Sequence, residues 1–190
     1  MGNLVIESGI AKAIDELFME MLSKGGKPRL NVISGSMQPL IRIGDNVVIK
    51  QIRTKDLIIS DIIVYQANQQ YITHRVFSKR KSNGQLVFYT KGDMLINFDP
   101  PITEKQIIGK VIAIEKLNRI LKLDSFCGKI INYFIFFYLF LFWSVYKLAR
   151  FFKRKLIGKQ KNKLVSFCYR FFWKMLPLLP QSLLKMINFF

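Results

Sequence analysis

Two serines in the segment VISGSMQPLIRIGD, residues 32–45, are candidates for nucleophilic catalysis. Ser34 and Ser36 flank a single glycine, and apolar residues lie on both sides of the segment. A serine hydroxyl is a poor nucleophile unless a base accepts its proton and hydrogen-bond donors stabilise the oxyanion that forms. A plain turn that uses serines for local hydrogen bonds is the competing interpretation.

The only histidine of the chain is the candidate base. His74 lies in YITHRV, and the alternation of a strand places it on the same face as Ile72 and Val76. Downstream, Asp93 and Asp99 in TKGDMLINFDPP offer a carboxylate for the second ring nitrogen, which would fix the tautomer and stabilise the imidazolium. A core histidine with satisfied hydrogen bonds and ordinary turn aspartates remain the alternative.

Short strands must position these residues. Segments rich in Val, Ile, Tyr and Phe, separated by turn residues, predict strands at 30–33, 46–52, 61–66, 71–78, 85–91 and 106–114. The Asn-Gly of KSNGQ predicts a hairpin turn, and QANQQ a second hairpin loop. Because no strand-helix-strand alternation is visible, the fold class is mainly β, with an antiparallel domain over residues 28–115.

Residues 1–27 predict an amphipathic helix. Its apolar stripe is interrupted by acidic residues, and Gly25 and Gly26 end it. Docking against the β domain is the favoured interpretation, and a helix on a membrane surface the second. The segment resembles neither a signal peptide nor a first membrane span, so we expect no export signal there.

Residues 116–190 predict hydrophobic and basic helices. They hold 15 Lys and Arg against the single acid Asp124, whereas residues 1–115 hold 15 against 11. Residues 130–146 carry no charge and nine aromatic side chains, and as a helix they would be about 26 Å long, slightly short of a bilayer core of about 30 Å. A span, a helix in the interface and a buried helical hairpin all stay open.

An anionic lipid membrane is the partner that residues 130–190 predict, because Lys and Arg recur among apolar side chains there. Nucleic acid is not expected as a partner, since few Asn, Gln, Ser or Thr accompany these basic residues. Cys127 and Cys168 have no metal-ligand spacing and form no disulfide framework. We therefore expect no metal site.

Six segments occur in the order and approximate spacing of type I signal peptidases: SGSMQP, RIGD, DIIVYQ, YITHRV, TKGD with a second Asp six residues on, and IIGKVIAI. More narrowly, they resemble the branch of archaea, the endoplasmic reticulum and some spore-forming bacteria, which has His where the common bacterial branch has a general-base Lys. The resemblance covers roughly residues 30–115.

This resemblance implies a role for each candidate. Ser36 would be the nucleophile and His74 the general base, and then the acid for the leaving amine. The family pattern favours Asp99 as the acid that orients the imidazole, with Asp93 second and also needed. Ser34 would donate its hydroxyl to the oxyanion hole. Two lysines, Lys50 and Lys91, are rival bases, but neither occupies the motif position that His74 fills.

The resemblance also implies a β fold of two sheets and cleavage of an extended precursor peptide after a small side chain, without a cofactor. SMQPLI and DIIVY are candidate pocket walls. The chain departs from the family at Gln38, which is often Glu, and at Met94 and Leu95, where Asn is usual. Its long hydrophobic segment follows the β domain, whereas family members usually have a membrane anchor before it. We expect a membrane location, with the catalytic domain either outside, by the positive-inside rule, or attached on the cytoplasmic side.

Two further functions stay open beside a membrane-associated serine endopeptidase. One is a self-cleaving regulatory peptidase of the same fold, similar to the SOS repressors. The other is a non-catalytic module that keeps the fold to bind membranes or precursors.

Overall fold

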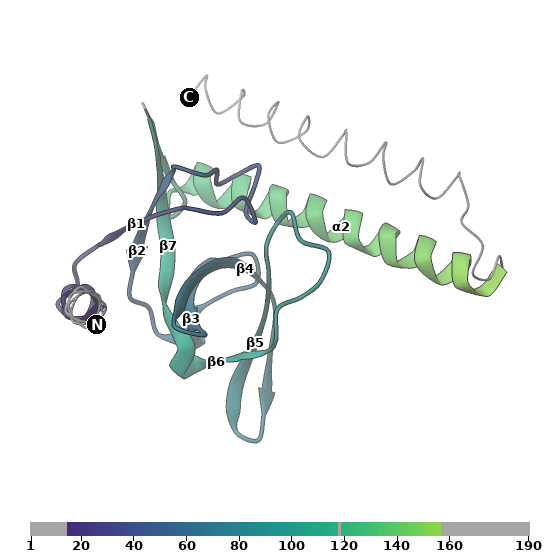
Figure 1. Ribbon diagram of the computed structural model, residues 1–190, viewed down its shortest axis with the longest axis horizontal. Coiled ribbons are helices and arrows are strands. Elements are labelled where there is room, and N and C mark those ends of the chain that lie inside the picture. The colour runs from purple at the N-terminus through teal and green to yellow at the C-terminus, as the bar shows by residue number, and fades with distance from the viewer. Residues whose placement is uncertain (1–14, 118, 157–190) are drawn as a thin grey trace, which may run out of the picture.

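The computed structural model describes residues 15–117 and 119–156, and its centre is one antiparallel β sheet (Figure 1). Each strand pair in the sheet is antiparallel, and the order is β1-β2-β7-β3-β4-β5-β6, with β8 paired to β7. The mainly β antiparallel fold class is therefore confirmed. The strands are β1 (Arg29–Asn31), β2 (Asn46–Lys50), β3 (Ile62–Ala67), β4 (Gln70–Ser82), β5 (Gln85–Lys91), β6 (Ile102–Thr103), β7 (Ile107–Lys116) and β8 (Arg119–Lys122), with short 3-10 helices η1 (Thr54–Asp56) and η2 (Glu104–Gln106).

The strands join into one hydrogen-bonded sheet, so the expectation of two sheets is wrong in this respect. The sheet curls in Figure 1 and buries side chains on both faces. Along β3, Ile62 and Val64 belong to one hydrophobic cluster, and Ile63 and Tyr65 belong to another. A strand that is buried on both faces has an unbroken run of apolar residues, and IIVY in β3 is such a run.

Both predicted hairpins are present. Asn83 and Gly84 connect β4 and β5 with φ of 48° and 79°, and Asn68 and Gln69 connect β3 and β4 with φ of 49° and 61°. Two-residue loops with both φ angles positive match the twist of the flanking strands. Strands β6 and β8 were not predicted, and β8 lies at 119–122, where the sequence had suggested helix.

The N-terminal helix is described over residues 15–23 and docks against the β domain. Leu22 is buried in the main hydrophobic cluster, and Phe18 packs on Tyr71 with their ring centroids 5.5 Å apart. The Tyr71 hydroxyl donates to Asp15 at 3.0 Å. Gly25 follows with φ of 79° and ends the helix as predicted. The first part of the predicted helix, residues 1–14, lies outside the described residues.

A long helix, α2 (Phe126–Leu156), runs along one side of the β structure and projects beyond it (Figure 1). Its buried residues Ile135 and Leu139 belong to the same cluster as the strands, and Trp143 packs against Phe98. By length and composition, Phe126–Leu148 could cross a membrane. The predictions for residues 157–190 lie outside the described residues.

Candidate active site

Ser36, His74 and Asp99 form one hydrogen-bonded chain. Nε2 of His74 lies 3.1 Å from Oγ of Ser36, and Nδ1 of the same ring lies 2.7 Å from Oδ2 of Asp99. His74 is in the middle of β4 and is buried, whereas Ser36 is half-buried in the loop after β1. The two ring nitrogens thus face a hydroxyl and a carboxylate, which is the arrangement that proton transfer from a serine requires.

Two residues that the sequence did not single out support Asp99. The hydroxyl of Thr90 donates to Oδ2 of Asp99 at 2.7 Å, and the backbone N–H of Asp99 donates to the carbonyl of Thr90 at 2.9 Å. The buried Tyr65 also lies near this carboxylate, and its hydroxyl lowers the pKa of Asp99. Thr90 begins the TKGD segment and Tyr65 lies in DIIVYQ, but only the pairing of β3, β4 and β5 brings them to Asp99.

These contacts keep Asp99 ionised. Burial raises the pKa of the Asp99 carboxyl, but hydrogen bonds from His74, Thr90 and Tyr65 and the charge of the imidazolium outweigh it, so the net pKa lies below the ordinary value of 3.8. Burial raises the pKa of Tyr65 to about 12, so its hydroxyl remains a donor at neutral pH. An ionised acid behind the ring can stabilise the imidazolium that forms when Ser36 loses its proton.

The Ser36 loop is held in place on two sides. Behind it, Met37, Leu40 and Ile41 are buried in the main cluster. In front, the backbone N–H of Met94 donates to the carbonyl of Ser36 at 2.9 Å, which ties the loop to the segment after β5. Because the core fixes one side and a backbone hydrogen bond the other, Ser36 is presented to His74 by rigid structure.

Gly92 lies against both catalytic candidates. A Cβ at this position would come within 2.8 Å of the Ser36 carbonyl oxygen and 2.9 Å of Nε2 of His74. We therefore expect Gly92→Ala to displace the ring or the serine loop and to slow the reaction of Ser36 with a serine-directed acylating probe by about 100-fold or more. Probe labelling and thermal unfolding of the same preparation test this. Labelling at the rate of the unmodified chain would contradict it.

Ser34 lies beside the nucleophile candidate. Its Oγ is 3.3 Å from Oγ of Ser36, and either hydroxyl can be the donor. Ser34 is exposed, so it can rotate its hydroxyl toward a bound ligand. The position agrees with that of an oxyanion donor, and the role itself stays a prediction.

Asp93 lies elsewhere, in a buried ion pair with Arg75. Nε and Nη2 of Arg75 donate to the two carboxylate oxygens of Asp93 at 2.8 and 2.7 Å, and both side chains are fully buried. Nη1 of Arg75 donates to the Ser60 carbonyl at 3.0 Å and also to Oδ1 of Asn132 on α2. Nδ2 of Asn132 donates to the same carbonyl at 2.9 Å. Asp93 therefore pairs with Arg75, the β4 residue after His74, and Arg75 also contacts α2 through Asn132, while Asp99 contacts the ring.

The predicted pocket walls are largely core. In SMQPLI, Met37, Leu40 and Ile41 are at most 1% exposed, and IIVY of β3 is buried throughout. The interpretation of these side chains as substrate walls was wrong, because they present almost no surface to a ligand.

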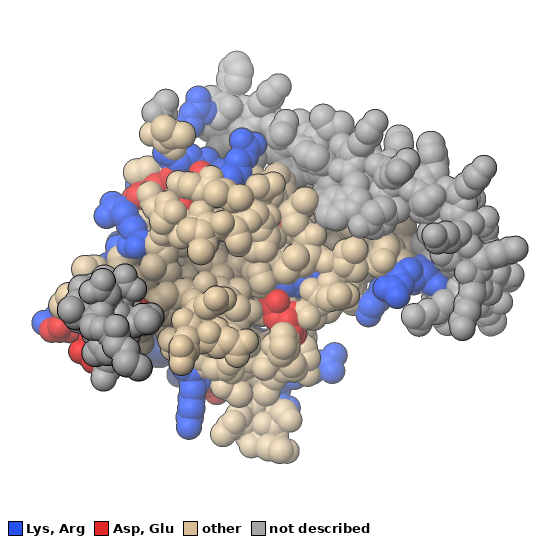
Figure 2. Space-filling model, viewed as in Figure 1, with Lys and Arg blue, Asp and Glu red and all other residues tan. Residues whose placement is uncertain are grey.

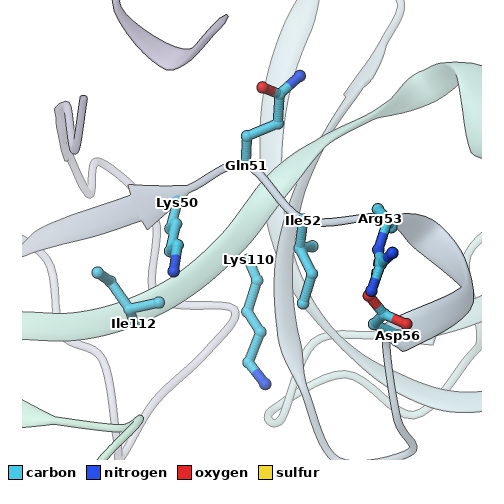
Figure 3. A pocket seen from close by; sticks show the side chains of 7 residues that line it. All are labelled: Lys50, Gln51, Ile52, Arg53, Asp56, Lys110 and Ile112. Carbon is cyan, nitrogen blue, oxygen red and sulfur yellow. Dashed lines mark hydrogen bonds and ion pairs between the residues drawn. The ribbon is translucent and has the colours of Figure 1, made fainter. Parts of the chain in front are cut away.

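The rival bases lie apart from the serine. Lys50 is exposed at the end of β2 and lines a pocket of about 280 Å³ with Lys110 and Arg53 (Figure 3). Arg53 pairs with Asp56 in this pocket at 2.7 Å, and the pocket shares no residue with the Ser36, His74 and Asp99 chain. The amine of Lys91, which is buried, lies 4.8 Å from the centre of the Phe77 ring. Neither amine hydrogen-bonds to Ser36 in the described part of the chain.

Lys91 carries an unfavourable buried charge. Burial lowers its pKa from 10.5 to about 8, against the opposing attraction of Asp93 and Asp99, and Arg75 lowers it further. Between pH 8 and 10.5 the unfolded chain binds more protons at this site than the folded one, so stability gains a contribution as the pH rises through that window.

We expect Lys91→Met to stabilise the fold at pH 7 by on the order of 1–3 kcal/mol, with an advantage that shrinks toward pH 10.5. Urea unfolding of both chains at several pH values measures the difference. The exposed Lys50→Met is the matched control and is expected to show no such convergence. A constant offset between the chain and its Lys91 variant over the whole range would contradict the prediction.

Comparison with known proteins gives one relative of known class. The chain is 35% identical over 79 residues to signal peptidase I W of Bacillus subtilis (strain 168). The match supports the signal peptidase family. It covers 37% of this chain and 42% of the relative, so the chain spans less than half of the relative's length. No family model matches the chain.

The partial match and the fold agree with each other. The antiparallel β sheet is consistent with a β-rich fold of the signal peptidase type.

Proposed function

We propose that the chain is a membrane-associated serine endopeptidase that cleaves signal-type or leader-type precursor peptides after small residues. The observation that carries the proposal is the hydrogen-bonded line Ser36, His74, Asp99, with Nε2 3.1 Å from the hydroxyl and Nδ1 2.7 Å from the carboxylate. The family relationship supports the precursor substrate, and the imidazole in the line favours the His-containing branch over a Ser-Lys dyad.

The chemistry would run through an acyl-enzyme. Nε2 of His74 accepts the proton of Ser36 as Oγ attacks the scissile carbonyl, and the Ser34 hydroxyl and the Ser36 backbone N–H stabilise the oxyanion. The imidazolium then gives its proton to the leaving amine as the peptide bond breaks. A water molecule, deprotonated by the same ring, attacks the acyl carbonyl, and the proton returns to Ser36 as the precursor's N-terminal part leaves as a free acid.

Asp99 and its partners hold the ring for both steps. The carboxylate accepts from Nδ1, which leaves Nε2 free to take the serine proton. Thr90 and Tyr65 occupy other positions around the carboxylate and oppose its rotation away from the ring. Their predicted role is positioning, since neither contacts Ser36 among the contacts that the structure describes.

The test uses the full chain in detergent or vesicles with synthetic precursor peptides. Each peptide carries an apolar segment followed by a small residue at the expected cleavage point, and mass spectrometry identifies the products. Cleavage after the small residue, and its loss when that residue is changed to Phe, support the proposal. Binding of the peptides without any product would instead favour the non-catalytic module, and a truncated form of the chain itself would favour self-cleavage.

A further inference from the structure

Helix α2 has two apolar faces, and the β domain covers only one of them. Asn132, Ile135 and Leu139 are buried on the covered face. Exposed apolar residues recur on the other face at intervals of three and four, which places them in one stripe at 100° per residue. We call this set the outer stripe: Ile130, Tyr133, Phe134, Phe137, Phe140, Leu141, Val145 and Leu148.

Docking on the β domain leaves α2 no free length with which to span a bilayer. The helix is fixed to the domain from Asn132, which hydrogen-bonds to the Ser60 carbonyl, to Trp143, which packs on Phe98. Only residues 144–156 follow, about 20 Å of helix against a bilayer core of about 30 Å. Five of these residues are Lys or Arg. A span through Phe126–Leu148 would require the covered face to leave the domain and expose Asn132 to lipid.

The charges on α2 fit a lipid surface. The helix contains no Asp or Glu. Lys129 and Lys147 are exposed and five helical turns apart, so they flank the outer stripe on the same side. The amine of Lys147 lies 3.9 Å from the centre of the Trp143 ring. In Figure 2, Lys and Arg side chains gather near the end of α2 that projects from the β structure.

We propose that the outer stripe is a membrane-docking surface and that α2 lies in the plane of an anionic bilayer instead of crossing it. The aromatic side chains would occupy the boundary between headgroups and acyl chains, and Lys129 and Lys147 would pair with lipid phosphates. The covered face would stay on the β domain. This inference concerns the orientation of the helix and does not depend on peptidase activity, so each proposal can fail without the other.

Two engineered cysteines distinguish the two orientations. In the full chain with Cys127→Ser and Cys168→Ser, Lys129→Cys and Arg150→Cys lie about 32 Å apart along the helix, enough to reach opposite sides of a bilayer core. Intact cells and opened cells that express each variant are treated with a membrane-impermeant maleimide. If the helix lies in the plane of the membrane, both cysteines are on the same side, so we expect both to react in intact cells or both to react only in opened cells. Opposite behaviour of the two positions would overturn the proposal.

The stripe itself is tested with purified full chain and vesicles. The double variant Phe134→Ser/Phe137→Ser is expected to weaken binding to phosphatidylglycerol-containing vesicles by about tenfold or more. The control Leu117→Ser/Ile120→Ser changes two exposed apolar residues of the β7–β8 hairpin and is expected to bind like the unmodified chain. Equal binding by the stripe variant would contradict the proposal.

A third measurement asks whether protein already covers the stripe. In the same cysteine-free background, Phe137→Cys is expected to react with maleimide in vesicle-free solution and to be protected once vesicles are added. Protection without vesicles would mean that residues 157–190 or a second copy occupies this face, and the proposal would fall.

Discussion

Ser36→Ala is expected to abolish cleavage of precursor peptides, with a loss in kcat of about 10⁵-fold or more. The remaining hydroxyl at the site, Ser34, is not hydrogen-bonded to His74 among the contacts that the structure describes. Ser36 is half-buried, and its hydroxyl hydrogen-bonds to His74 and Ser34. Alanine should therefore leave the free energy of unfolding within about 1 kcal/mol of the original.

Mass-spectrometric product formation and urea unfolding, measured on the same preparation, check both parts of this expectation. Ser34→Ala is the matched control, because it removes the neighbouring hydroxyl without removing the nucleophile. Its expected loss in kcat is smaller, about 10²–10³-fold if the hydroxyl stabilises the oxyanion. Cleavage by Ser36→Ala at the original rate would exclude the serine mechanism.

Substitution of Asp99 is expected to reduce activity, whereas substitution of Asp93 is expected to reduce stability. Asp99→Asn should lower kcat by about 10⁴-fold with the fold retained, because an amide can donate to Nδ1 and thereby hold the wrong tautomer. Asp93→Asn should instead lower the free energy of unfolding by about 3–5 kcal/mol, because the Arg75 guanidinium would stay buried without its counter-charge.

Steady-state kinetics and denaturant unfolding of both variants separate these effects. A catalytic collapse in Asp93→Asn with unchanged stability, together with full activity in Asp99→Asn, would reverse the assignment. Asp45→Asn is a control for loss of a less buried aspartate, since its partner Lys116 is partly exposed and can reach water. We expect it to cost about 1 kcal/mol or less.

The strands that carry the site were predictable because their sequences combine β-branched and aromatic residues with clear turn signals. The loops at Asn83-Gly84 and Asn68-Gln69 set the register of β4 against its two neighbours. The strand β8 was missed because RILK is short, charged and mostly exposed, and only its pairing with the end of β7 makes it a strand. Local sequence patterns could not predict that the strands form a single sheet, because strand order depends on contacts between residues far apart in sequence.

Within the site, residue types limited the candidates before geometry was known. A chain with one histidine offers few bases, so His74 and a following aspartate could be proposed from the sequence. The residues alone did not decide between Asp93 and Asp99, since both follow β5 and each has a cationic or donor partner on β4; only the resemblance to the family favoured Asp99. Thr90 and Tyr65 are common residue types in strands, and nothing in their local sequence signals a contact with Asp99.

The contacts of α2 have a consequence for the order in which the protein matures during synthesis. The core that supports Ser36 and β4 includes Ile135 and Leu139, and the fully buried Arg75 meets Asn132. A ribosome that has released only the strands has not yet supplied these partners. The arrangement of Ser36, His74 and Asp99 is therefore completed late, after the helix has emerged, so a nascent chain halted near residue 115 would lack part of the interior that the finished protein needs.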